Sequence, residues 1–158
     1  MENINRFKAA MAAVAAGLTA LWGWFGWFII LLGLCMVLDY TTGSAAAIKN
    51  GKWNSQTARE GLWHKLSIAV AVIVACILDI VLGMIINNIP AVELPFTYSV
   101  LFGPIVVAWY ILTELGSLLE NAGKLGAPQP AWFKKAVSAL EGGVDKAGEK
   151  LTDGGTKT

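Results

Sequence analysis

The run from Ser67 to Ile86 contains a single charged residue, Asp79. A bilayer core about 30 Å thick is crossed by a helix of roughly 20 predominantly apolar residues, which is the length of this run. Two other runs, at about 25–47 and 96–119, are similar and also contain one acid each. All three are too long and too continuously apolar for ordinary strands. They predict an all-α integral membrane protein with three core transmembrane helices.

The overall composition supports a membrane protein. Hydrophobic residues make up 56% of the chain and charged residues only 15%, whereas about a quarter of a soluble domain is charged. The formal net charge of +1 argues against nucleic acid as a partner, which requires a dense basic face. The two cysteines, Cys35 and Cys76, lie inside apolar runs without disulfide or metal-ligand spacing. We interpret them as small buried hydrophobic residues.

The segments on either side of the membrane core (25–119) are predicted to be amphipathic helices. In residues 1–24, bulky apolar residues recur at spacings of three and four, and the opposite face carries alanine and glycine. This Ala-rich helix could lie in the interface or span the bilayer; a cleavable signal peptide is a third alternative. In the tail, 120–158, a thinner apolar stripe comprises Phe133, Val137, Leu140, Val144, Ala147 and Leu151.

Charges in the loops predict the orientation. The segment between the first two runs carries four basic residues and one acid, Glu60; the basic residues are Lys49, Lys52, Arg59 and Lys65. The segment between the second and third runs, 87–95, carries one acid and no base. The positive-inside rule places the basic loop in the cytoplasm, and the third span then returns the C-terminal tail to the cytoplasm.

Each predicted span contains an acid that needs a partner. Asp39, Asp79 and Glu114 would each cost a few kcal/mol if ionised in hydrocarbon, so each requires a protein partner, water or a proton. For Asp39 and Glu114, an interfacial, solvated position is an alternative. Asp79 lies on a stripe of small residues spaced by four, which favours close helix packing or oligomerisation, or the lining of an aqueous path; the stripe includes Ala71, Ala75 and Gly83.

Asp39 and Gly43 are predicted to form the cytoplasmic shoulder of the first span. We expect this shoulder to pack against the start of the second span, near Gly61 and Lys65. The acid ends the apolar run close to headgroup depth, where a lysine of the basic loop could neutralise it; the candidates are Lys49, Lys52 and Lys65.

No catalytic pattern is present in the sequence. The only histidine, His64, lies beside Lys65 in the predicted loop. We find no Gly-rich phosphate loop, no metal-ligand cluster and no nucleophile motif with its base. The sequence therefore predicts no enzyme activity, no cofactor and no metal site.

Several blocks resemble a known family in order and spacing. The block DYTTGSAAAIKNGKWNSQTAREGLWHKL (39–66) is similar to the block that follows the first span in bacteriophage holins of the toxin-secretion and phage-lysis type. A late acid in the second span matches Asp79, and TELGSLLENAGKLGAPQPAWFKKAV (113–137) resembles the end of the third. The similarity covers about residues 37–137. His64 and the Ala-rich N-terminal helix depart from the pattern.

The resemblance implies a multi-pass protein of the bacterial host's cytoplasmic membrane. Its partners would be the lipid bilayer and further copies of itself, and its lesions would release a muralytic enzyme or a toxin. Coupling to such an endolysin needs no direct contact. Two other classes remain open: a small ion- or proton-coupled transporter with Asp79 or Glu114 as the titrating group, and a membrane anchor whose tail recruits a partner.

Overall fold

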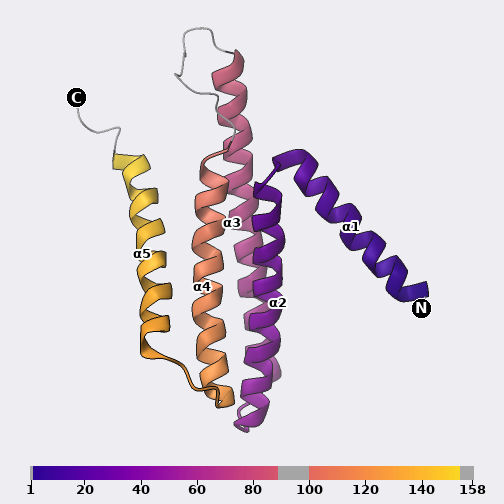
Figure 1. The fold of residues 1–158 in the computed structure, drawn as a ribbon, viewed down its shortest axis with the longest axis vertical. Coiled ribbons are helices and arrows are strands. Elements are labelled where there is room, and N and C mark those ends of the chain that lie inside the picture. The colour runs from indigo at the N-terminus through magenta and orange to yellow at the C-terminus, as the bar shows by residue number, and fades with distance from the viewer. Residues whose placement is uncertain (1, 89–99, 154–158) are drawn as a thin grey trace.

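A computed structural model, which describes residues 2–88 and 100–153, shows a bundle of long helices (Figure 1). In the described residues there are five helices and no strand: α1 (Glu2–Trp22), α2 (Phe25–Lys49), α3 (Ser55–Asn88), α4 (Phe102–Leu125) and α5 (Ala131–Asp153). Among them, α2, α3 and α4 are long and apolar enough to cross a membrane. The predicted all-α fold with three core spans is confirmed.

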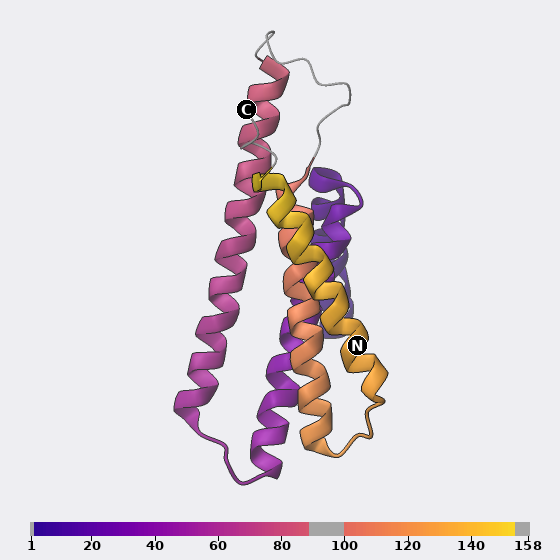
Figure 2. The ribbon, with the colours of Figure 1, turned by 90° about the vertical axis from the view of Figure 1, so that its left-hand side faces the viewer.

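Helix α4 is the centre of the bundle, because it contacts α2, α3 and α5. It runs in the same direction as α2, and α3 and α5 run the opposite way (Figures 1 and 2). The turns at 50–54 and 126–130 therefore lie at one end of the bundle, together with Lys49, Lys52 and Lys124. We call this the basic end.

The apolar core is formed where α2, α3 and α4 meet. Its buried members recur at helical spacing on all three helices: Phe25, Leu32, Cys35, Ile68, Val72, Cys76, Val107 and Ile111. Both cysteines are free and buried, as predicted. The outer face of α3 instead exposes bulky side chains, among them Ile73 at 56% and Met84 at 62%. Such a continuous apolar surface suits lipid chains rather than water.

Helix α3 begins earlier than the apolar run that it contains. The Asn54 side chain accepts a hydrogen bond from the backbone N–H of Gln56 at 2.8 Å, which is the geometry of an N-cap. The helix therefore includes Arg59 and Lys65, so the prediction that these residues lie in a loop is wrong. At about 1.5 Å per residue, the helix is about 51 Å long and exceeds the bilayer core.

Helix α4 is bounded by local backbone chemistry rather than by hydropathy. Gly103 and Pro104 lie in its first turn, where a proline is tolerated because its missing N–H would have no helical partner. The helix continues beyond the apolar run to Leu125 and ends at Gly126, whose φ of 100° is left-handed. The predicted start of this span and most of the preceding loop (89–99) lie outside the described residues.

The two flanking helices, α1 and α5, contact different helices of the bundle. Helix α1 contacts α2 and projects away from the bundle (Figure 1), and a left-handed Gly23 (φ 57°) separates the two. Its side chains Ile4 and Phe7 are 59% and 67% exposed. Helix α5 confirms the predicted tail helix and packs beside α4, where Val137 is only 8% exposed. Neither α1 nor α5 reaches the apolarity of the three spans.

Candidate functional site

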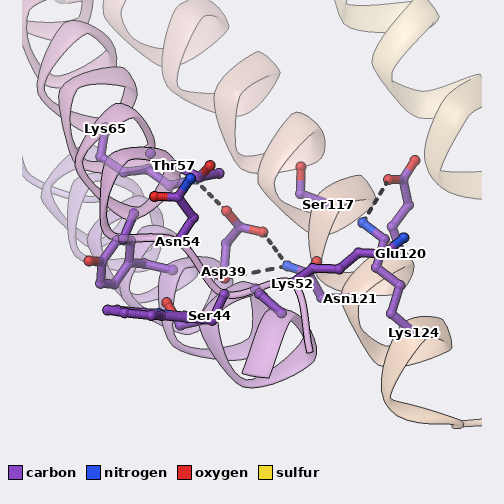
Figure 3. Close-up of a pocket in the computed structure, with 16 residues that line it drawn as sticks. Asp39, Ser44, Lys52, Asn54, Thr57, Lys65, Ser117, Glu120, Asn121 and Lys124 are labelled. Carbon is purple, nitrogen blue, oxygen red and sulfur yellow. Dashed lines mark hydrogen bonds and ion pairs between the residues drawn. The ribbon is translucent and has the colours of Figure 1, made fainter. Parts of the chain in front are cut away.

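A lysine from α3 joins acids from α2 and α4 near the basic end. The Lys65 ammonium lies 2.7 Å from Oδ2 of Asp39 and also donates a hydrogen bond to the carboxylate of Glu114. Asn121 lies about two turns beyond Glu114 on the same face of α4. Its Nδ2 donates to Oδ1 of Asp39 at 2.9 Å. Figure 3 shows Asp39 between Lys65 and Asn121. We call these four residues the Lys65 cluster.

The positions of the three charged residues along their helices explain why they meet. Asp39 precedes the end of α2 at Lys49, Lys65 follows the start of α3, and Glu114 precedes the end of α4. At about 1.5 Å per residue, each lies about 15 Å from the basic end of its own helix. Since the three helices begin or end together there, the charged groups occupy the same depth. Lys65 immediately precedes the apolar part of α3 and therefore marks the edge of the membrane core.

The cluster is largely buried, and its positive and negative charges do not balance. Relative exposure of the side chain is 12% for Lys65, 16% for Asp39 and 2% for Glu114. With all three groups ionised, one ammonium faces two carboxylates, which leaves one net negative charge. Removing ions from water has a large desolvation cost that only close pairing and further hydrogen bonds offset. The amide of Asn121, itself 8% exposed, supplies one of those hydrogen bonds.

These contacts identify the basic partner of Asp39 among the candidates from the sequence. Lys65 is that partner, whereas Lys49 donates to the backbone carbonyl of Leu125 at the end of α4. A cation at a helix C-terminus is favourable because the helix dipole is negative there. Lys52 lies in the turn at 50–54 and is exposed. Glu114 is inside the protomer rather than in the solvated position that the sequence left open.

Gly43 does not pack against the second span as predicted. A Cβ at this position would lie 3.3 Å from Nδ2 of Asn121, on α4. The contact with α3 is made instead by Tyr40, whose ring lies 3.9 Å from a Cβ built at Gly61. For Gly43 the prediction is wrong because α4, rather than α3, lies along this face of α2, whereas Asp39 does meet Lys65. The missing side chain at Gly43 leaves room for Asn121 to reach Asp39.

A pocket of about 320 Å³ lies beside the cluster (Figure 3). Its lining includes Asp39, Lys65 and Asn121, together with Lys52, Asn54 and Lys124. The pocket adjoins the turn at 50–54, and it is large enough to admit several water molecules. Water can therefore approach the cluster from the basic end.

Asp79 forms a separate buried site near the opposite end of α4. Its carboxylate is 2% exposed and accepts hydrogen bonds from the backbone N–H groups of Leu101 (3.0 Å), Phe102 (2.9 Å) and Gly103 (2.7 Å). These groups begin α4, where the unpaired N–H donors and the helix dipole favour an anion. A Cβ at Gly103 would lie 3.0 Å from both Oδ2 of Asp79 and Cζ of Phe25, so only glycine permits this close approach.

The small-residue stripe around Asp79 lies largely inside the protomer. Ala75 and Asp79 are buried, and Ala71 and Gly83 are half-buried. The hydrogen-bond partner of Asp79 is thus the start of α4 in the same chain. Sequence reasoning missed this partner and the role of Asn121. Two signals could have indicated them: Gly103-Pro104, which is typical of a helix start, and the spacing of Glu114, Ser117 and Asn121 along one face.

The remaining chemistry of the described residues is limited. Among them there is no group of three or more His, Cys, Asp or Glu residues that could hold a metal ion, and His64 is exposed. No buried side-chain nitrogen or oxygen of the described part lacks a hydrogen-bond partner. What the described part of the chain does hold is a set of paired charges inside a helix bundle.

The chain is similar to members of one known family. The model of the bacteriophage holin family matches residues 16–142. An uncharacterised protein of Halalkalibacterium halodurans is 34% identical over 146 residues, which cover 92% of this chain and 100% of the relative. An uncharacterised 14.9 kDa protein from the nagH 3′ region of Clostridium perfringens is 29% identical, over 89% of this chain and 97% of its own length. No solved structure matches the chain.

Proposed function

Because the chain belongs to the bacteriophage holin family, we propose that it oligomerises in the bacterial cytoplasmic membrane and forms lesions there. The lesions would let a muralytic enzyme, or a toxin, leave the cytoplasm without direct contact between that protein and this one. The family supports a holin-like membrane function in general, and the three apolar helices support a multi-pass position in the bilayer.

The Lys65 cluster is the observation that carries this proposal. While α2, α3 and α4 are packed together, the charges of Asp39, Lys65 and Glu114 are paired within one protomer. If the helices separate, these groups need water, since a charge in hydrocarbon costs at least about 2.5 kcal/mol. The packed bundle can therefore accumulate harmlessly in lipid. A rearranged assembly that exposes the cluster is stable only around an aqueous lesion.

We further propose that the basic end faces the cytoplasm. Lys49, Lys52 and Lys124 lie at this end, and the positive-inside rule favours such a side for short loops. The C-terminal tail then starts in the cytoplasm, next to the turn at 126–130. Lys65 and Arg59, in the first turns of α3, lie on the same side.

The stripe of Ala71, Ala75, Asp79 and Gly83 serves oligomerisation indirectly in this proposal. By attaching α3 to the first turn of α4 through Asp79, it fixes which face of α3 points outward. That outward face is apolar, with Ile73 and Met84 among its exposed members. Copies of the chain can associate through it without disturbing the buried acids.

Co-expression with a muralytic enzyme that lacks its own export signal tests the proposal. We expect cultures that produce both proteins to lyse abruptly after a reproducible delay, because the enzyme reaches the cell wall only through a lesion. Cultures that produce either protein alone should not show enzyme-dependent lysis. Unbroken growth of the double producer, with the chain present in the membrane fraction, would contradict the proposal.

A small proton- or ion-coupled transporter is the second candidate, and the pocket beside Asp39 and Lys65 is the observation that favours it. The two functions differ in what crosses the membrane. Vesicles that contain the purified chain should release an encapsulated fluorescent dye if it forms lesions. Dissipation of a pH or ion gradient with complete retention of the dye would favour the transporter.

A further inference from the structure

Helix α5 follows α4 along most of its length (Figures 1 and 2). Near the basic end Val137 is buried; further along, the Thr113 hydroxyl donates to the Glu141 carboxylate at 2.9 Å. Close to the start of α4, a Cβ at Gly148 would lie 3.9 Å from Cγ2 of Ile105. Since α4 is one of the three spans, α5 in this position reaches across the same depth of the membrane.

The composition of α5 conflicts with a position in lipid. The helix is not apolar enough to be a candidate span, and it carries lysines in its first half and both signs of charge from Glu141 onward. Its charged residues are Lys134, Lys135, Glu141, Asp145, Lys146, Glu149, Lys150 and Asp153. All four lysines are exposed. Lys135, Lys146 and Lys150 lie on the helix face opposite Val137 and Gly148, whereas Lys134 lines a small pocket against α4. Ionised side chains at this depth require water or buried partners.

The contact between α5 and α4 is also incompletely packed. A pocket of about 390 Å³ lies between the two helices, lined by Ile105 and Trp109 on one side and by Asp145 and Glu149 on the other. On the α5 side the lining also includes Val144 and Gly148, so two acids lie there beside apolar groups of both helices. The apolar groups suit lipid chains when α5 is elsewhere, and the acids suit water.

We propose that α5 lines the aqueous interior of the assembled lesion, docked on α4 with its lysine-bearing face in water. The inference rests on the proposed function, since it requires a lesion. In the intact membrane α5 lies on the cytoplasmic side, connected through the turn that begins at the left-handed Gly126. When water enters the assembly, α5 swings against α4 and covers its apolar side chains. The docked helix adds its charged face to the wall of the lesion, beside the exposed Lys65 cluster.

Thiol labelling in cells tests this assignment. In a chain whose two native cysteines are replaced by alanine, Lys146→Cys reports the outer face of α5 and Val137→Cys reports its contact with α4. A membrane-impermeant maleimide is added after a voltage-sensitive dye registers depolarisation. We expect Lys146→Cys to react about tenfold faster than Val137→Cys, because thiolates react only where water and reagent reach them. Ile77→Cys, on the outer face of α3, is the lipid-facing control and should stay unlabelled.

A cross-link gives an independent readout. With Ile105→Cys and Gly148→Cys together, an added oxidant should form an intrachain disulfide after depolarisation and not before it. Three results would overturn the assignment and leave the proposed function intact. They are equal labelling at the two α5 positions, no labelling at Lys146→Cys, and no disulfide after normal depolarisation. Absence of depolarisation in the native chain would contradict both.

Discussion

Replacing Lys65 with methionine is expected to destabilise the helix bundle by about 3–5 kcal/mol, because removing one partner of a buried ion pair leaves uncompensated charge. In this protein two carboxylates, of Asp39 and Glu114, lose the ammonium that lies between them. Methionine has nearly the volume of lysine, so packing is little changed. The measurement is equilibrium unfolding of the purified protein in mixed detergent micelles, with helix content as the signal.

Two variants separate the charge effect from a general effect of substitution. Lys52→Met removes a lysine from the exposed turn at 50–54 and should shift stability by less than about 0.5 kcal/mol. Combining Lys65→Met with Asp39→Asn and Glu114→Gln should restore most of the lost stability, since a neutral set of similar volume can replace a buried ionic one. If Lys65→Met and Lys52→Met have the same free energy of unfolding, the Lys65 cluster does not stabilise the bundle.

Replacing Asp79 with alanine is expected to release the start of α4. Three backbone N–H groups, those of Leu101, Phe102 and Gly103, lose their acceptor. An unsatisfied buried donor costs about 1–3 kcal/mol, so we expect a total loss of about 3 kcal/mol or more. Amide hydrogen exchange should rise sharply in a peptide that covers 101–103 and only slightly at the basic end of α4.

Conservative variants test whether the carboxylate itself is required. Asp79→Asn keeps one acceptor oxygen but points an N–H donor at another donor, so it should give an intermediate loss. Ser67→Ala, on the same helix, removes a hydroxyl that donates to the backbone carbonyl of Trp63 and should leave exchange at 101–103 unchanged. Unaltered exchange in Asp79→Ala would show that the start of α4 is held by other contacts.

The spans could be predicted because hydropathy over about 20 residues marks them. A basic partner for Asp39 could also be predicted, but the choice of Lys65 among Lys49, Lys52 and Lys65 depends on where α3 begins. The participation of Glu114 and Asn121 could not be predicted in the same way. It depends on how α4 is rotated about its axis against α2, which the packing of Val107 and Ile111 determines. The same rotation places Gly43 against Asn121 rather than against α3.

The partner of Asp79 shows a different limit of sequence reasoning. Small residues spaced by four predict that another backbone approaches α3 closely, and the backbone of α4 does so at Gly103. From the sequence alone, the approaching backbone could equally have belonged to a second copy of the chain. Only the tertiary structure brings the first turn of α4 to Asp79. For α5, the helical pattern could be predicted. Its docking on α4 could not, because a helix with eight charged residues gives no sequence signal for contact with an apolar span.

The most direct test of the account is the membrane potential of single cells that express this chain without any muralytic enzyme. A voltage-sensitive dye should show an unchanged potential while the protein accumulates, followed by abrupt and complete depolarisation within a narrow window of time in each cell. This result is expected because paired charges keep the packed bundle inert until an aqueous assembly forms. A gradual decline in proportion to the amount of protein, or an unchanged potential with the chain abundant in the membrane, would contradict it.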